Sequence, residues 1–196
     1  MQEILTYYIQ TICRWILRCG YSRGFGIQSP SAYSFVRYVI NEHYPYYAYQ
    51  QLDEDMKGKS RKFRKLGRLF FRISNYWQPQ YVVLGDYAYA PYLYAGCNGT
   101  SVRMVGDCCL ENVTRPVLVI LDIDRMDDGS LREAILSSSS ERVLLVVIGI
   151  CTNKKSKLLW SQLMSDERIG VTYDLYHCGI AFFDKSKHKQ DFKINF

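Results

Sequence analysis

The sequence lacks the residue patterns of common catalytic and metal sites. Its three histidines lie far apart, and no serine or cysteine stands in the pattern of a nucleophile elbow. The seven cysteines are odd in number and scattered, with no Cys-x-x-Cys pair, which excludes a typical zinc or thioredoxin-like motif. Unpaired, scattered cysteines favour a protein of the reducing cytoplasm. The sequence therefore leaves the catalytic residues unknown and predicts no metal site.

Long apolar runs are also missing from the first part of the chain. Gln10, Arg14 and Arg18 interrupt residues 1–19, so this stretch matches neither a signal peptide nor a membrane span. The 196 residues are 48% hydrophobic, which is enough for one compact domain with a sizeable core. We therefore expect a cytoplasmic protein without a transmembrane segment.

Glycine is scarce at the place where a nucleotide-binding loop would need it. Residues 81–84 predict a short buried strand that ends at Gly85 and Asp86, and residues 87–95 resume a helical pattern. A loop that holds phosphates or adenosine needs several glycines, because side chains keep the ligand away from the backbone. Here a single glycine is followed by Tyr87 and Tyr89, which are expected to fill the ligand's space.

The first third of the chain predicts helices. Apolar residues recur at helical spacing over residues 4–19, and Ser29 and Pro30 are typical of the start of a second helix that runs to about Glu42. A third helix is expected over about 60–77, with apolar residues on one face. Its basic face carries Arg61, Lys65, Arg68 and Arg72.

This basic helix holds most of the chain's positive charge. Residues 53–72 contain eight Lys or Arg and three Asp or Glu, against a net charge of +6 for the whole chain. Such a face can bind nucleic acid or an anionic membrane surface, but charged faces are usually solvated. Because the aromatic residues lie on the opposite side of the helix, base stacking is not supported. We expect a mostly solvated basic face without specific affinity for nucleic acid.

The rest of the chain alternates strands with helices. Residues 81–84, 117–121 and 143–148 are unbroken apolar runs, and residues 102–105 are apolar except for Arg103; such runs are typical of parallel strands covered on both faces. Crossover helices are expected at 132–136 and 156–164, a hairpin between 171–176 and 180–183, and a last strand at 192–196. The predicted fold class is α/β: a mostly parallel, Rossmann-like sheet with helices on both faces and a C-terminal antiparallel hairpin. An N-terminal helical segment (1–77) precedes this core (78–196), and together they form one compact unit.

Several stretches share the pattern of one known family. They are GFGIQSP at 24–30, PYYAY at 45–49, KLGRLFFR at 65–72 leading into Gln78 and Pro79, Trp160, and YDLYHCGIAFF at 173–183. Over nearly its whole length the chain thus resembles the small bacterial proteins related to class I S-adenosylmethionine-dependent methyltransferases that carry a helical N-terminal segment. The resemblance implies a methyltransferase-like fold, with a seven-stranded sheet whose last two strands form a hairpin.

The chain departs from this family where the cofactor would bind. The family has an acidic residue in its first strand and several glycines after it, whereas this chain has Val83 and Tyr89 at the matching positions. The acid expected after the second strand is matched by Gly106, with Asp107 one residue later. If cofactor binding is retained, the resemblance assigns it to Gly85, Asp86, Asp107 and Asp122. Alternatively, Asp122 and the acids after it only cap turns of a solvated loop.

Two tyrosine clusters are further candidates for this region. Tyr46 and Tyr47 follow the second predicted helix, and Tyr87 and Tyr89 follow the first strand. Tyrosine combines an apolar ring with a polar tip, so these residues suit either a plugged cleft or a ligand-lined one. We expect them to face each other across the former cofactor cleft and to plug it.

Three functions remain open at this point. The preferred interpretation is a methyltransferase-like protein that has lost its cofactor and serves as a non-catalytic binding or scaffold module for an unidentified small molecule or protein. The alternative is an active S-adenosylmethionine-dependent methyltransferase with a divergent site. A third, weaker alternative is nucleic-acid or membrane-surface binding through the basic helix.

Overall fold

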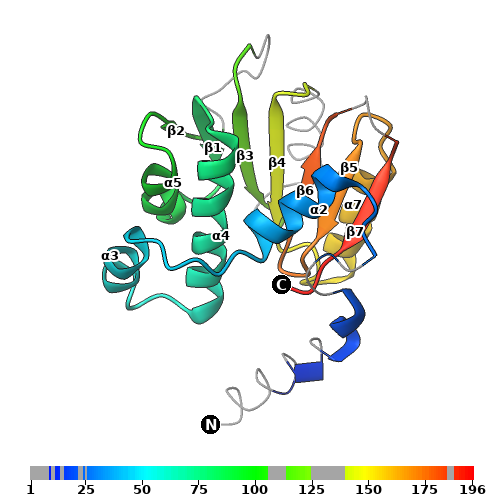
Figure 1. The fold of residues 1–196 in the computed structure, drawn as a ribbon, viewed down its shortest axis with the longest axis horizontal. Coiled ribbons are helices and arrows are strands. Elements are labelled where there is room, and N and C mark those ends of the chain that lie inside the picture. The colour runs from blue at the N-terminus through cyan, green and yellow to red at the C-terminus, as the bar shows by residue number, and fades with distance from the viewer. Residues whose placement is uncertain are drawn as a thin grey trace.

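Seven strands form one mixed sheet in the order β2-β1-β3-β4-β6-β5-β7 (Figure 1). The strands are β1 Tyr81–Leu84, β2 Ser101–Met104, β3 Val117–Asp122, β4 Val143–Ile148, β5 Val171–Asp174, β6 Cys178–Phe182 and β7 Gln190–Lys193. The first four pair in parallel, β6 runs antiparallel to β4 and β5, and β7 pairs in parallel with β5. This confirms the predicted mostly parallel sheet with a C-terminal hairpin. The computed structural model describes residues 9, 12–13, 16–21, 24, 26–105, 114–124, 140–184 and 188–196.

The helices begin at the capping residues that the sequence marks. Ser29 Oγ accepts from Ala32 N at 3.4 Å, and Ser60 Oγ accepts from Phe63 N at 3.2 Å, so each satisfies a free amide of the first turn. The helical elements are η1 Cys19–Tyr21, α2 Pro30–Phe35, η2 Val36–Ile40, α3 Ala48–Asp55, α4 Arg61–Trp77, η3 Tyr87–Tyr89, α5 Ala90–Gly96 and α7 Lys154–Ser165. The helix predicted over about 60–77 is confirmed as α4, whereas α3 was not predicted.

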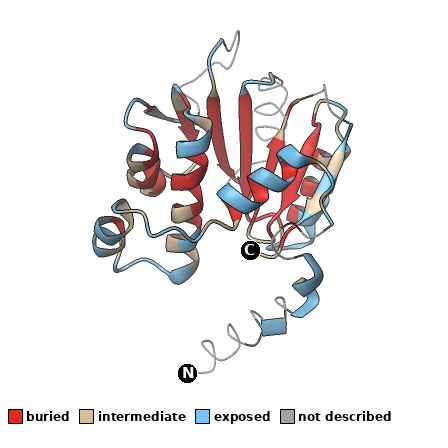
Figure 2. Ribbon diagram, in the orientation of Figure 1, coloured by how far each residue is buried: buried red, intermediate tan, exposed pale blue. Residues whose placement is uncertain are grey.

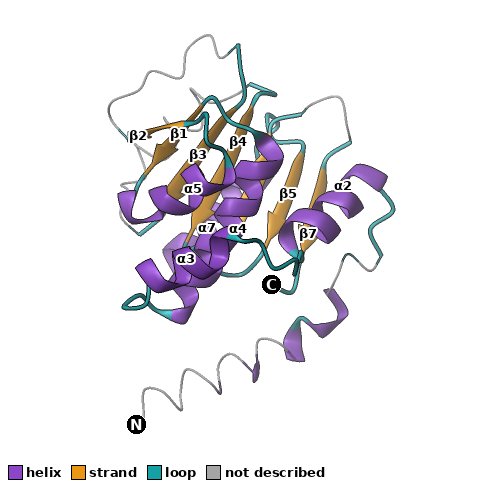
Figure 3. Cartoon of the chain, turned by 60° about the vertical axis from the view of Figure 1, so that its left-hand side comes forward, coloured by secondary structure: helices purple, strands orange, loops and turns teal. Residues whose placement is uncertain are grey.

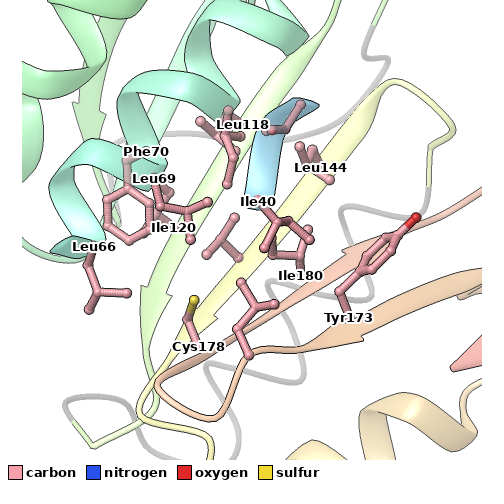
Figure 4. Close-up of a cluster of buried hydrophobic side chains, with 14 of the residues drawn as sticks. Ile40, Leu66, Leu69, Phe70, Leu118, Ile120, Leu144, Tyr173, Cys178 and Ile180 are labelled. Carbon is pink, nitrogen blue, oxygen red and sulfur yellow. The ribbon is translucent and has the colours of Figure 1, made fainter. Parts of the chain in front are cut away.

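Helices cover both faces of the sheet, and the inner strands β1, β3, β4, β5 and β6 are buried, whereas the edge strands β2 and β7 are mostly exposed or half-buried (Figures 2 and 3). On one face, α2, η2 and α4 pack on alternate residues of β1, β3 and β4, as the close-up of Phe70, Ile120 and Leu144 shows (Figure 4). On the other face, Trp160 and Leu163 of α7 pack on the remaining strand residues. Burial on both faces explains why β3 and β4 read as unbroken apolar runs.

The C-terminal hairpin turns earlier than the sequence predicted. Its turn is formed by residues 175–177, where Tyr176 has a left-handed φ of 71°, and Gly179 lies inside β6. A Cβ atom on Gly179 would lie 2.3 Å from the Trp160 ring, so this glycine is required by packing and not by the turn. The helix predicted at 132–136 lies outside the described residues.

Residues 16–21 are joined to the C-terminal strands by Arg18 and by the backbone of Tyr21, whose carbonyl accepts from Asn195 N at 3.0 Å. Arg18 Nη2 donates to both carboxylate oxygens of Asp174 at 3.0 Å, and Arg18 Nη1 donates to the Asp174 carbonyl at 3.0 Å. The described apolar residues before it, Ile9, Ile12 and Ile16, are exposed. None of the helices in the described part of the chain has the length and apolar character needed to cross a bilayer.

The reactivity of Cys178 measures whether reagents in solvent can reach this core. This residue is fully buried at the start of β6, and burial raises the pKa of its thiol to about 12, with the nearby Asp174 charge adding to the shift. In folded protein near pH 8 we expect iodoacetamide to modify the exposed Cys13 and Cys19 and to leave Cys178 unmodified, as measured by peptide mass spectrometry.

The pH dependence follows from the same shift. The folded pKa of Cys178 lies above the ordinary value of 9.0. The thiol's contribution to stability is therefore complete below about pH 9 and decreases as the pH rises toward 12. Protein unfolded in urea is the control, in which Cys178 should react as fast as Cys13. Labelling of Cys178 at an equal rate in folded protein would contradict the closed core.

Candidate functional site

The loop after β1 is closed by protein side chains. Gly85 N donates to Ile120 O at 2.9 Å, and Asp86 Oδ1 accepts from Ala88 N at 3.0 Å, which starts η3. Tyr89 follows at the end of η3 and is only 6% exposed. Its ring stacks on Phe63 with centroids 4.2 Å apart and meets Phe70 edge-on at 4.8 Å. Tyr89 is thus packed against α4.

The four candidate tyrosines lie in different surroundings. Tyr46 packs edge-on against Tyr49 and Phe71 at 5.3 and 4.9 Å, in a second cluster with the fully buried Tyr92. Phe63 joins the two clusters, because it also meets Tyr92 at 6.4 Å. By contrast, Tyr47 is 97% exposed and Tyr87 is 55% exposed. Whether this group plugs or lines a cleft stays a prediction.

The ends of β3 and β4 bring several of the predicted residues together. A Cβ atom on Gly85 would lie 3.5 Å from Asp122 N, and one on Gly149 would lie 3.6 Å from Asp122 Oδ1. Asp122 Oδ1 accepts from Asp124 N at 3.1 Å, which is the turn-capping role considered for it. Gly85, Asp122 and Gly149 therefore lie together at the carboxyl edge of the sheet.

Asp124 connects this edge to α7. Its Oδ1 atom accepts hydrogen bonds from Thr152 Oγ1 at 2.9 Å, Asn153 Nδ2 at 3.2 Å and Ser156 Oγ at 3.2 Å. These donors belong to the first turn of α7 or precede it, so this carboxylate oxygen holds the helix start. Asp107 lies outside the described residues. Across the described ranges, no group of three His, Cys, Asp or Glu residues is placed to hold a metal ion.

A separate hollow of about 730 Å³ lies along the polar side of α4. Its walls are the end of η2 with the following residues, α3, α4 and the last two residues of the chain. It is lined by Ile40, Asn41, Glu42, His43, Tyr49, Asp53, Arg61, Arg64, Lys65, Arg68, Arg72, Asn195 and Phe196. We call it the basic hollow. The hollow lies at the carboxyl edge of the sheet, because Asn195 and Phe196 follow the end of β7, which runs in the same direction as β1, β3 and β4.

The basic face of α4 is more enclosed than the sequence predicted. Arg72 is 7% exposed, and its guanidinium donates to Val39 O at 2.6 Å, Ile40 O at 3.0 Å and Tyr49 Oη at 3.2 Å. Arg68 forms an ion pair with Asp53 and lies over the Tyr49 ring at 4.9 Å. The expectation of a solvated face is therefore wrong for Arg72, which residues 39–40 and Tyr49 cover, whereas Arg61 and Lys65 are exposed.

Positive charge is concentrated in the basic hollow. Five Lys or Arg residues line it, against Glu42 and Asp53. Partial burial lowers the pKa of Lys65, and the charge of Arg61 lowers it further. Lys65 Nζ also lies 4.3 Å from the centroid of the Phe196 ring. The sequence analysis did not select Arg64 or Phe196 as site residues. The spacing of residues 61, 64 and 65 is the signal that could have placed Arg64 on the basic face.

Comparisons with known proteins identify no family for this chain. A methyltransferase from Geobacter sulfurreducens is similar in structure, with a TM-score of 0.48 and 12% sequence identity over 80% of this chain and 98% of that chain. No protein-family model matches the sequence, and no curated protein matches it.

Proposed function

We propose that this chain is a non-catalytic binding module, built on a methyltransferase-like fold, that does not bind S-adenosylmethionine. The observation that carries the proposal is Tyr89, which is 6% exposed and stacked on Phe63 at 4.2 Å directly after the first strand. A cofactor approaches the backbone of such a loop only where side chains are absent. The ring takes part in the core, so it cannot move aside without a cost in packing.

The nearby carboxylates support the same conclusion. Asp86 is occupied in capping η3, and Asp122 accepts from the amide of Asp124. Val83, at the position of the family's first acid, is buried among apolar residues of the opposite face. Each missing carboxylate removes a charge-assisted hydrogen bond worth roughly 1.5–3 kcal/mol, so two such losses weaken binding by about a hundredfold or more.

We therefore expect calorimetry to detect no binding of S-adenosylmethionine, or of its demethylated product, to the unmodified protein at concentrations up to about 1 mM. The outcome that contradicts the proposal is micromolar binding of either compound. Asp122→Asn is the matched control for that outcome, because binding that uses the carboxyl edge of the sheet should be lost in this variant.

One observation favours the second candidate, an active methyltransferase. Gly85, Asp122 and Gly149 lie together at the carboxyl edge of the sheet, where α/β proteins bind their ligands. In such an enzyme S-adenosylmethionine would be the cofactor, and Asp122 would be one of the residues that hold it. The same titration separates the two candidates, because the enzyme requires the binding that the module lacks.

A further inference from the structure

We propose that the basic hollow binds a small molecule that carries a phosphate group. The lining of the hollow includes no residue of the closed loop after β1, although Phe63 of α4 packs on Tyr89 of that loop, so this inference goes beyond the proposed function. The hollow uses residues of α3, α4, residues 40–43 and the C-terminal end.

Three cations in the hollow lack a negative partner. Arg61, Arg64 and Lys65 are spaced three and four residues apart on α4, so their side chains start from the same face of the helix. Within the described part of the chain, none of the three forms an ion pair. Like charges at this spacing repel each other, and the repulsion increases as the groups lose contact with water. A bound anion would remove it.

One oxygen of each acid in the hollow is already engaged. Asp53 Oδ2 pairs with Arg68, and Glu42 Oε1 accepts from the backbone amides of His43 at 2.7 Å and Tyr44 at 2.8 Å. Arg72 is satisfied by backbone carbonyls. Arg61, Arg64 and Lys65 therefore leave an excess of positive charge that an external anion would neutralise.

Buried polar atoms that lack partners point to the same hollow. Arg64 Nε, Arg68 Nε, Asn41 Nδ2 and Asp53 Oδ1 are buried, and no described atom forms a hydrogen bond with them. All four belong to residues that line the hollow, and three of them are donors. Leaving buried donors unsatisfied is costly, and a ligand with several acceptor oxygens would satisfy these three.

A phosphate group matches these requirements better than a carboxylate. It offers three acceptor oxygens and up to two negative charges, and arginine binds it with two parallel hydrogen bonds. The volume of about 730 Å³ is that of a small-molecule pocket, and the rings of Tyr49 and Phe196 provide apolar wall for the rest of the ligand. A nucleic-acid strand needs an open groove, whereas walls from three other segments border this face of α4.

The test is calorimetric titration with inorganic phosphate and with adenosine 5′-monophosphate at roughly 150 mM salt. We expect both probes to bind, and Arg64→Gln and Arg61→Gln each to weaken binding about tenfold or more. Arg61 is exposed, so Arg61→Gln leaves the fold intact even if Arg64→Gln does not. Arg142→Gln is the control, because this exposed arginine precedes β4 and does not line the hollow.

Three outcomes overturn the inference. They are the absence of phosphate and nucleotide binding up to about 10 mM, equal affinity in Arg61→Gln and Arg142→Gln, and much tighter binding of a ten-residue oligothymidylate than of the mononucleotide. The last result would assign the hollow to nucleic acid.

The two proposals fail separately, because S-adenosylmethionine binding that survives Arg61→Gln contradicts the closed loop alone, whereas failure of the phosphate probes contradicts the hollow alone.

Discussion

Replacing Tyr89 with alanine is expected to lower the free energy of unfolding by about 3–5 kcal/mol and to leave the protein without S-adenosylmethionine binding. The ring is 6% exposed, stacks on Phe63 and meets Phe70 edge-on, so truncation leaves a cavity between η3 and α4. Removing the ring does not restore the missing acids of the family. Urea unfolding measures the first effect, and calorimetry measures the second.

Tyr47→Ala is the matched control for this variant. The residue is another of the predicted cleft tyrosines but is 97% exposed, so its truncation should change the free energy of unfolding by less than about 0.5 kcal/mol. A loss below about 1 kcal/mol in Tyr89→Ala would show that the ring does not hold the loop. Cofactor binding gained in this variant would show that the ring alone blocks the site.

Gly67→Ala is expected to destabilise the protein by about 1–3 kcal/mol, although alanine normally favours a helix interior over glycine by about 1 kcal/mol. A Cβ atom on Gly67 would lie 2.4 Å from the ring of Tyr92, which is fully buried and has no room to turn. α4 and α5 would have to separate to admit it. Thermal or urea unfolding measures the loss.

Gly58→Ala controls for the glycine replacement itself. No heavy atom lies within 4 Å of a Cβ atom built on Gly58, and its φ is not in the left-handed region. Its free energy of unfolding should stay within about 0.5 kcal/mol of the unmodified protein. If Gly67→Ala proved as stable as Gly58→Ala, the close contact between α4 and α5 would be contradicted.

Local patterns were sufficient where neighbours in sequence decide the structure. Ser60 caps α4 through Phe63, three residues away, and β1 and β4 have the bounds predicted for them. The unbroken apolar runs identified the parallel strands, because strands covered on both faces have no polar side. By contrast, α3 carries mostly polar residues, and the apolar residues Tyr49 and Leu52, with Met56 directly after the helix, recur at helical spacing over only two turns, which is too short a pattern to predict a helix.

The predicted cofactor residues show how far such patterns reach. The positions of Gly85 and Asp122 follow from the strands that precede them, and the sheet brings them together at one edge. The sequence also predicted that Tyr89 would occupy the space of a ligand. The sequence did not show that the ring of Tyr89 packs on Phe63, because Phe63 lies on α4, in another part of the chain.

By itself, the sequence determined the fold class, the helix starts and the basic stripe on α4, because periodicity, capping and charge act between residues a few positions apart. Only the tertiary structure decided which residues of this stripe are covered by other parts of the chain. Arg72 bonds to Val39 and Ile40, which are 33 and 32 residues away, and Lys65 lies over Phe196 at the chain's end. Contacts of this length depend on how the elements pack, so one set of arginines is satisfied while Arg61 and Arg64 are left facing a hollow.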